Sequence, residues 1–154
     1  MKKVLFVCLG NICRSPMAHG IFQRMVDDAG LSERIFVDSA GTGAYHIGEL
    51  PDKRAQETCR ERGIKLTHKA RVFSKNDFDT FDYILAMDKE NMINIQKLKP
   101  DTHKAKLKLM RAYDTKYPNA EVPDPYFGEI DGFAEVFDML ERSCEELMKE
   151  VIDK

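Results

Sequence analysis

The stretch that decides the fold of this chain is Val4-Leu5-Phe6-Val7-Cys8-Leu9-Gly10-Asn11-Ile12-Cys13-Arg14-Ser15-Pro16. The apolar run from Val4 to Val7 predicts a buried strand. Ser15 followed by Pro16 is typical of a helix start, with Ser15 as the N-cap and Pro16 in the first turn. The sequence therefore predicts a strand, a loop over residues 8–14 and a helix, in that order.

This loop has the features of a binding site for a tetrahedral oxyanion. Gly10 and Asn11 are residue types that tolerate a left-handed backbone, so the loop can curl and direct several N–H groups inward. Together with the helix N-terminus and Arg14, these groups would surround an anion. The same surroundings keep a thiol in its thiolate form. We therefore interpret Cys8 as a nucleophile, although a lone cysteine after an apolar run is more often a core residue.

The segment from Cys8 to Pro16 matches the signature of the low-molecular-weight protein tyrosine phosphatases, and the chain resembles this family further along. The likeness continues at Asp38-Ser39-Ala40-Gly41-Thr42, His68-Lys69-Ala70-Arg71, Asp82-Tyr83-Ile84-Leu85-Ala86-Met87-Asp88 and Asp124-Pro125-Tyr126. These segments follow the family's order and cover nearly the whole chain. A single domain over residues 1–154 is therefore expected.

Strands and helices alternate along the predicted chain. Further strands are expected at residues 35–38, 83–87 and 106–110, and further helices at 51–62, from the cap Asp88 to Pro100, and at 131–152. Residues 39–43 are predicted as a loop. This alternation indicates an α/β fold with an open, mostly parallel sheet between two helix layers, and with ligands bound beyond the carboxyl ends of the strands. The resemblance implies four parallel strands in the order 2-1-3-4, with the phosphate-binding loop after the first.

The resemblance also implies a reaction that passes through a phosphocysteine and needs no metal or cofactor. Cys8 would attack phosphorus, and Asp124 would protonate the leaving oxygen and later activate water. Arg14 and the loop N–H groups would hold the phosphate oxygens. Pro123 and Pro125 flank Asp124 and would hold it on a stiff loop, although Pro-Asp-Pro alone is ordinary turn chemistry.

The other site residues follow from the same resemblance. The remaining phosphate-binding positions are Leu9, Gly10, Asn11, Ile12, Cys13 and Ser15. Ser39 and His68 would support the loop through hydrogen bonds, with a turn residue and a solvated histidine as the alternatives. Tyr45 and Tyr126 would form aromatic walls that favour a flat phosphotyrosyl group over a short phosphoserine.

The four cysteines have spacings typical neither of a zinc site nor of a secreted disulfide framework. We therefore expect a reducing cytoplasm. Cys59 and Cys144 are predicted to be buried packing residues. By the resemblance, Cys13 can form a protective disulfide with Cys8 under oxidant, which would make the enzyme redox-regulated. Simple packing within the loop is the alternative for Cys13.

Composition argues against several classes of partner. The net charge of −2 comes from interspersed charges of both signs, which is typical neither of nucleic-acid binding nor of a membrane-surface patch. No apolar run approaches the roughly 20 residues of a membrane span. The expected partners are phosphotyrosyl proteins or peptides, with inorganic phosphate and other oxyanions as competitive ligands.

Other proteins share parts of this signature. Protein-arginine phosphatases of the family usually have Thr where this chain has Ile12, so Ile12 favours phosphotyrosine. Arsenate reductases of the same fold relay electrons through extra cysteines near the third strand, and residues 84–96 contain none. Phosphocarrier proteins lack the equivalent of Arg14. A non-enzymatic phosphate-binding module would not need both Cys8 and Asp124.

Overall fold

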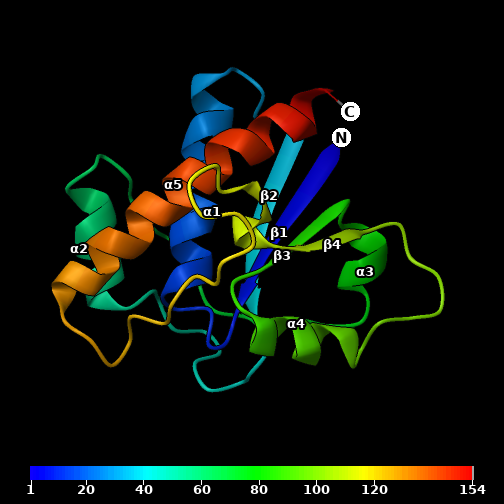
Figure 1. Cartoon of the computed structure of the whole chain (residues 1–154), viewed down its shortest axis with the longest axis horizontal. Coiled ribbons are helices and arrows are strands. Elements are labelled where there is room, and N and C mark those ends of the chain that lie inside the picture. The colour runs from blue at the N-terminus through cyan, green and yellow to red at the C-terminus, as the bar shows by residue number, and fades with distance from the viewer. Residues whose placement is uncertain (154) are drawn as a thin grey trace.

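The computed structural model describes residues 1–153, in which four strands form one sheet between two layers of helices (Figure 1). The strands are β1 (Lys2–Cys8), β2 (Ile35–Gly41), β3 (Tyr83–Ala86) and β4 (Lys106–Leu109). Their order is β2-β1-β3-β4, and every neighbouring pair is parallel. The predicted fold class and strand order are confirmed.

The helices divide between the two faces of the sheet (Figure 1). They are α1 (Arg14–Asp28), α2 (Lys53–Arg60), α3 (Asp77–Thr80), α4 (Lys89–Gln96) and α5 (Ile130–Asp153), and a short 3-10 helix, η1, covers Met110–Tyr113. α1, α2 and α5 contribute to one hydrophobic core, and α3 and α4 contribute to the other. Within residues 1–153, no helix combines the length and the apolar character that crossing a bilayer requires.

β1 is one of the two inner strands of the sheet, and its residues contribute to both cores. Val4 and Phe6 belong to the core beneath α1 and α5, whereas Leu5 and Val7 belong to the core beneath α3 and α4. All four side chains are fully buried, because a strand of a parallel sheet has helices on both faces.

α5 packs through the apolar stripe that its sequence predicts. The buried members of the stripe are Phe133, Val136, Phe137, Leu140, Cys144, Leu147, Met148 and Val151. Cys59 on α2 is also fully buried, so both cysteines are packing residues, as predicted. Burial raises the pKa of Cys59 to about 12 and raises that of Cys144 as well, which keeps both thiols protonated.

A buried carboxylate ties η1 to α5. Asp114 accepts hydrogen bonds from Arg111 Nε at 2.9 Å and from Arg142 Nε at 3.2 Å. Burial would raise the pKa of Asp114, but hydrogen bonds from Arg142, the Lys116 amide and Arg111 outweigh it and hold that pKa far below its usual range.

Two local predictions are wrong. α1 begins at Arg14 and its N-cap position falls to Cys13, so Ser15 is not the cap. The Ser15 hydroxyl is instead engaged with side chains of the preceding loop. Residues 39–41 extend β2 rather than starting a loop, because pairing with β1 continues until Gly41 lies opposite Cys8.

Candidate active site

The loop that joins β1 to α1 lies beyond the carboxyl edge of the sheet, with Cys8 ending the strand and Arg14 beginning the helix. Asn11 has the expected left-handed backbone, with a φ of 57°. Gly10 does not, since the glycines with positive φ in residues 1–153 are Gly30, Gly48 and Gly63. A Cβ on Gly10 would instead lie 3.0 Å from the His46 ring, so space is what limits this position.

The end of β2 presses directly on this loop. Thr42 N donates to Cys8 O and Gly43 N donates to Leu9 O, both at 2.9 Å. A Cβ on Gly41 would lie 2.7 Å from Leu9 O, a distance that real Cβ contacts do not reach. Gly41 is therefore required for the close approach of the two backbones.

The Cys8 thiol faces a hydroxyl whose orientation is constrained. Cys8 Sγ lies 3.0 Å from Ser15 Oγ. Asn11 Nδ2 donates to the same oxygen at 2.7 Å, so the hydroxyl proton of Ser15 must point to another acceptor. Cys8 Sγ is closer than the alternative, Ala40 O at 3.4 Å. This arrangement directs the hydroxyl proton of Ser15 toward Cys8 Sγ.

Arg14 is held in place by acceptors from two other loops. Nη1 donates to Asp88 Oδ2 at 2.6 Å and to Val122 O at 3.0 Å, while Nη2 lies 3.7 Å from Asp124 Oδ2. Burial works against the charged form of Arg14, but Cys8 and then Asp88 outweigh it, so the pKa of Arg14 is raised. The guanidinium therefore remains charged although it is almost fully buried.

A second layer of side chains lies behind the loop. Asn11 Oδ1 accepts hydrogen bonds from His68 Nε2 at 3.0 Å and from the Arg71 amide at 3.1 Å. Ser39 Oγ lies 3.0 Å from His19 Nδ1, so Ser39 is linked to α1. His68 therefore contacts the phosphate-binding loop directly through Asn11. The side chain of Ser39 instead contacts His19 of α1.

The loop opens into a cavity of about 400 Å³. Its lining consists of Cys8, Leu9, Gly10, Ile12, Cys13, Arg14, Tyr45, His46, Asp124, Tyr126 and Phe127. Most of the predicted substrate-contacting residues are therefore brought together, while Asn11, Ser15, Ser39 and His68 are outside the lining. Tyr45 and Phe127 are strongly exposed at the mouth, where they leave apolar surface free for a ligand.

Asp124 lies on a loop that Arg54 ties to α2. Asp124 Oδ1 accepts from the Tyr126 amide at 3.0 Å. Arg54 donates to Tyr126 O at 2.8 Å and to Gly128 O at 2.9 Å, and its guanidinium lies over the Phe133 ring at 4.6 Å. These contacts hold the carboxylate of Asp124 at the mouth of the cavity, where it is 37% exposed.

Cys13 lines the same cavity as Cys8, and both are free thiols. Burial, followed by the nearby Asp52 carboxylate, raises the pKa of Cys13. Cys13 is therefore a protonated thiol beside the proposed nucleophile.

The sequence reasoning missed several contributors to the site. Asp88 was expected only to cap α4, and it does so through Oδ1, which accepts from the Asn91 amide at 2.7 Å. Its second oxygen pairs with Arg14, a contact that no local pattern signals. Arg54, His46 and Phe127 were likewise not expected at the site. The aromatic character of Phe127, directly after Tyr126, was the one available signal.

Comparisons with known proteins agree on one family. The sequence model described as low molecular weight phosphotyrosine protein phosphatase matches residues 3–154. The chain is 45% identical over 150 residues to the Schizosaccharomyces pombe protein of that name, covering 97% of this chain and 96% of that one. A protein tyrosine phosphatase from Entamoeba histolytica, solved with Hepes in its active site, superposes with a TM-score of 0.95 at 39% identity, covering 99% of this chain and 98% of that one.

A Drosophila arginine phosphatase also has this fold. It superposes with a TM-score of 0.89 at 33% identity, covering 97% of each chain. Its likeness to this chain is weaker than that of the Entamoeba protein by both measures. With the family model spanning nearly every residue, the chain belongs to the low molecular weight phosphotyrosine protein phosphatase family.

Proposed function

We propose that this protein hydrolyses phosphotyrosine in proteins or peptides through a phosphocysteine intermediate. The observation that carries the proposal is that Cys8, Arg14 and Asp124 line one cavity of about 400 Å³. The supporting contact is the hydroxyl of Ser15, 3.0 Å from Cys8 Sγ. Nucleophile, cation and carboxyl group are the three parts that transfer of a phosphoryl group to sulfur requires.

The proposed reaction has two steps. In the first, Cys8 Sγ forms a bond to phosphorus while the bond to the tyrosyl oxygen breaks, and Asp124 gives that oxygen a proton. In the second, Asp124 takes a proton from a water molecule that attacks phosphorus, and the bond to sulfur breaks. Inorganic phosphate and the Cys8 thiolate are released. Arg14 and the loop N–H groups hold the phosphate oxygens in both steps.

The preference for phosphotyrosine rests on the walls of the cavity. Tyr45, Tyr126 and Phe127 offer aromatic surface at the mouth, and Cys8 lies at the buried end. A phenyl ring is long enough to span this depth and flat enough to pack between aromatic side chains. A phosphoseryl group is shorter and has no ring to pack against these side chains, so we expect it to be a poorer substrate. The Entamoeba relative has Hepes, a molecule that carries a sulfonate group, in its active site, which agrees with oxyanion binding in this cavity.

Two related activities are less well supported. An arsenate reductase of this fold would need extra cysteines near the third strand, but residues 84–96 contain none. Apart from Cys13, the remaining thiols, Cys59 and Cys144, are fully buried. An arginine phosphatase would have to bind a cationic guanidinium where Ile12 contributes apolar surface to the cavity. Because the Drosophila relative is named an arginine phosphatase, the test includes a phosphoarginyl substrate.

The test compares three peptides of equal sequence that carry phosphotyrosine, phosphoarginine or phosphoserine. We expect phosphate release from the phosphotyrosyl peptide, and its loss in Cys8→Ser. The matched control is Cys59→Ala, which removes a buried thiol that does not line the cavity. It should leave the rate within about twofold, with ~1 kcal/mol of stability lost. Full activity in Cys8→Ser would refute the assignment of the nucleophile. Faster release from the phosphoarginyl peptide would establish the alternative activity.

A further inference from the structure

A cluster of two histidines and one carboxylate lies behind the phosphate-binding loop, outside the cavity at Cys8. His19 comes from α1, Asp38 from β2 and His68 from the segment between α2 and α3. One ligand atom from each side chain lies within 4.8 Å of the other two, and all three residues are half-buried. The two imidazole rings pack edge to face, with their centroids 5.0 Å apart.

The hydrogen bonds of His68 leave a lone pair directed toward a negative charge. Because Asn11 Oδ1 is an acceptor, His68 must donate to it through Nε2. In a neutral ring the lone pair then belongs to Nδ1, which lies 3.5 Å from Asp38 Oδ1. Two electron-rich atoms at this distance are stabilised by a cation between them.

From this geometry we infer that His19, Asp38 and His68 bind a divalent transition-metal ion, with Zn²⁺ as the best match. Two imidazole nitrogens and one carboxylate oxygen suit Zn²⁺, whereas Mg²⁺ and Ca²⁺ prefer oxygen ligands only. Tetrahedral bonds of about 2.0–2.1 Å place neighbouring ligand atoms about 3.3 Å apart. The distance between His68 Nδ1 and Asp38 Oδ1, 3.5 Å, already fits this value.

Each proposed ligand has the outer hydrogen bond that metal ligands in proteins usually have. His68 donates to Asn11, and His19 Nδ1 is bonded to Ser39 Oγ at 3.0 Å, which leaves its other ring nitrogen available. Asp38 Oδ2 accepts from Arg71 Nε at 3.0 Å. The positive charge of Arg71 is itself shared with Asp77, at 3.1 Å from each of two nitrogens, so it does not exclude a cation.

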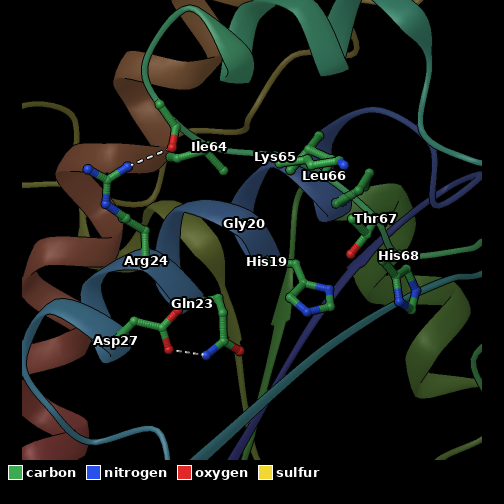
Figure 2. A pocket seen from close by; sticks show the side chains of 12 residues that line it. His19, Gly20, Gln23, Arg24, Asp27, Ile64, Lys65, Leu66, Thr67 and His68 are labelled. Carbon is green, nitrogen blue, oxygen red and sulfur yellow. Dashed lines mark hydrogen bonds between the residues drawn. The ribbon is translucent and has the colours of Figure 1, made fainter.

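The cluster is accessible from solvent. His19 and His68 line a second pocket of about 260 Å³, which Figure 2 shows between α1 and residues 63–68. In that view, both rings project from the same end of the pocket, beside Thr67. The pocket gives the ion a path to the site and leaves room for a water molecule as the fourth ligand, a common arrangement for Zn²⁺.

Binding at this site would act on the phosphate-binding loop. A metal on Nδ1 of His68 fixes the proton on Nε2, which is the tautomer that donates to Asn11. The ion would therefore stabilise the loop conformation rather than compete with the substrate. The proposed hydrolysis does not need the ion.

The experiment measures metal binding and not activity, so it does not depend on the proposed function. It uses the full chain with Cys8→Ser, which removes the proposed thiolate as a competing ligand. Titration with ZnCl₂ in a calorimeter should show one equivalent bound. Adding His19→Gln should weaken binding at least tenfold, because one of three ligands is lost. The matched control is His103→Gln, a half-buried histidine that packs on Phe78, 5.1 Å between ring centroids.

A second variant and a second probe guard against a folding defect. His68→Gln keeps a donor for Asn11 Oδ1 and should weaken binding as much as His19→Gln. With Co²⁺ as the probe, the visible spectrum should show nitrogen and oxygen ligands without the charge-transfer band of a thiolate. The proposal is overturned if one equivalent of Zn²⁺ does not bind. It is equally overturned if both histidine variants bind like the control, or if the Co²⁺ spectrum shows sulfur ligation.

Discussion

Asp88→Asn is the substitution that tests most sharply how Arg14 is positioned. Asp88 serves two partners, because Oδ1 accepts from the Asn91 amide at 2.7 Å and Oδ2 accepts from Arg14 Nη1 at 2.6 Å. Asparagine keeps a carbonyl oxygen for the first contact and places an NH₂ group at the second. The cap of α4 therefore survives, while Arg14 faces a donor instead of an acceptor.

The size of the effect follows from the burial of this pair. A hydrogen bond to a charged group contributes about 1.5–3 kcal/mol net. Breaking a fully buried ion pair costs about 3–5 kcal/mol. The Asp88 side chain is 20% exposed and that of Arg14 is 3% exposed. We therefore expect Asp88→Asn to lower the free energy of unfolding by a value near the boundary of these two ranges, about 3 kcal/mol. For a chain of this length, that loss lowers the Tm by about 6–12 °C.

Asp88→Asn should also slow catalysis, because the Arg14 side chain is no longer held in one orientation. We expect kcat/KM for an aryl phosphate to fall by about 10–100-fold, which corresponds to about 1.4–2.7 kcal/mol of transition-state stabilisation. The Tm is measured by circular dichroism and kcat/KM by release of the chromogenic phenol.

The matched control for Asp88→Asn is Glu121→Gln. Glu121 Oε2 accepts from the Lys89 amide at 2.7 Å, also at the start of α4. This control should change the stability by only about 0.5 kcal/mol. A lowered Tm with unchanged kcat/KM would show that Asp88 has no part in positioning Arg14. If neither quantity changes, the reasoning from the buried ion pair is refuted.

Three further substitutions test other parts of the molecule. Asp124→Asn should lower turnover by about 10²–10⁴-fold, the usual contribution of a general acid, and by less for substrates whose leaving group needs no proton. If steady-state assays show the same loss for substrates with and without this need, Asp124 has a structural role only. Cys13→Ser should keep its activity under reducing conditions but, unlike the wild type, should not regain it with dithiothreitol after a peroxide pulse; equal recovery would make Cys13 a packing residue. Asp114 has a folded pKa far below its unfolded value, so its stabilisation is complete above about pH 4 and is lost as the pH falls. In urea melts, Asp114→Asn should therefore be about 2–4 kcal/mol less stable than the wild type at pH 7, with a gap that narrows toward pH 2; a gap independent of pH would contradict the prediction.

The parts of the fold that the sequence predicts well depend on local patterns. The apolar run from Val4 to Val7 and the stripe on α5 need only the spacing of apolar residues, and both are confirmed. The cap of α4 by Asp88 is equally local and is also confirmed. The strand order, in contrast, came from the resemblance to a family. Local patterns alone indicate a parallel sheet but leave several orders possible.

The predictions fail where a distant residue competes with a local one. Ser15 has the sequence context of an N-cap, but Asn11 and Cys8 engage its hydroxyl. The same limit hides the cluster of His19, Asp38 and His68, because its members are too far apart in sequence to resemble a zinc motif. Their proximity depends on how α1, β2 and the segment after α2 pack, and no linear pattern records that packing.

The distances along the chain that the site bridges also bear on how the protein folds. Arg14 Nη1 and Val122 O are 108 positions apart, and Asn11 and His68 are 57 positions apart. Every strand pair of the sheet is parallel, so forming each pair closes a long loop of chain. The conformational entropy of that loop is lost before the strand contacts can compensate for it. During synthesis, Cys8 and Arg14 therefore emerge early. Of the acceptors that orient Arg14, Asp88 follows only after the middle of the chain and Val122 only in its last third. We therefore expect a refolding molecule to recover helical structure before it recovers the ability to hold an oxyanion.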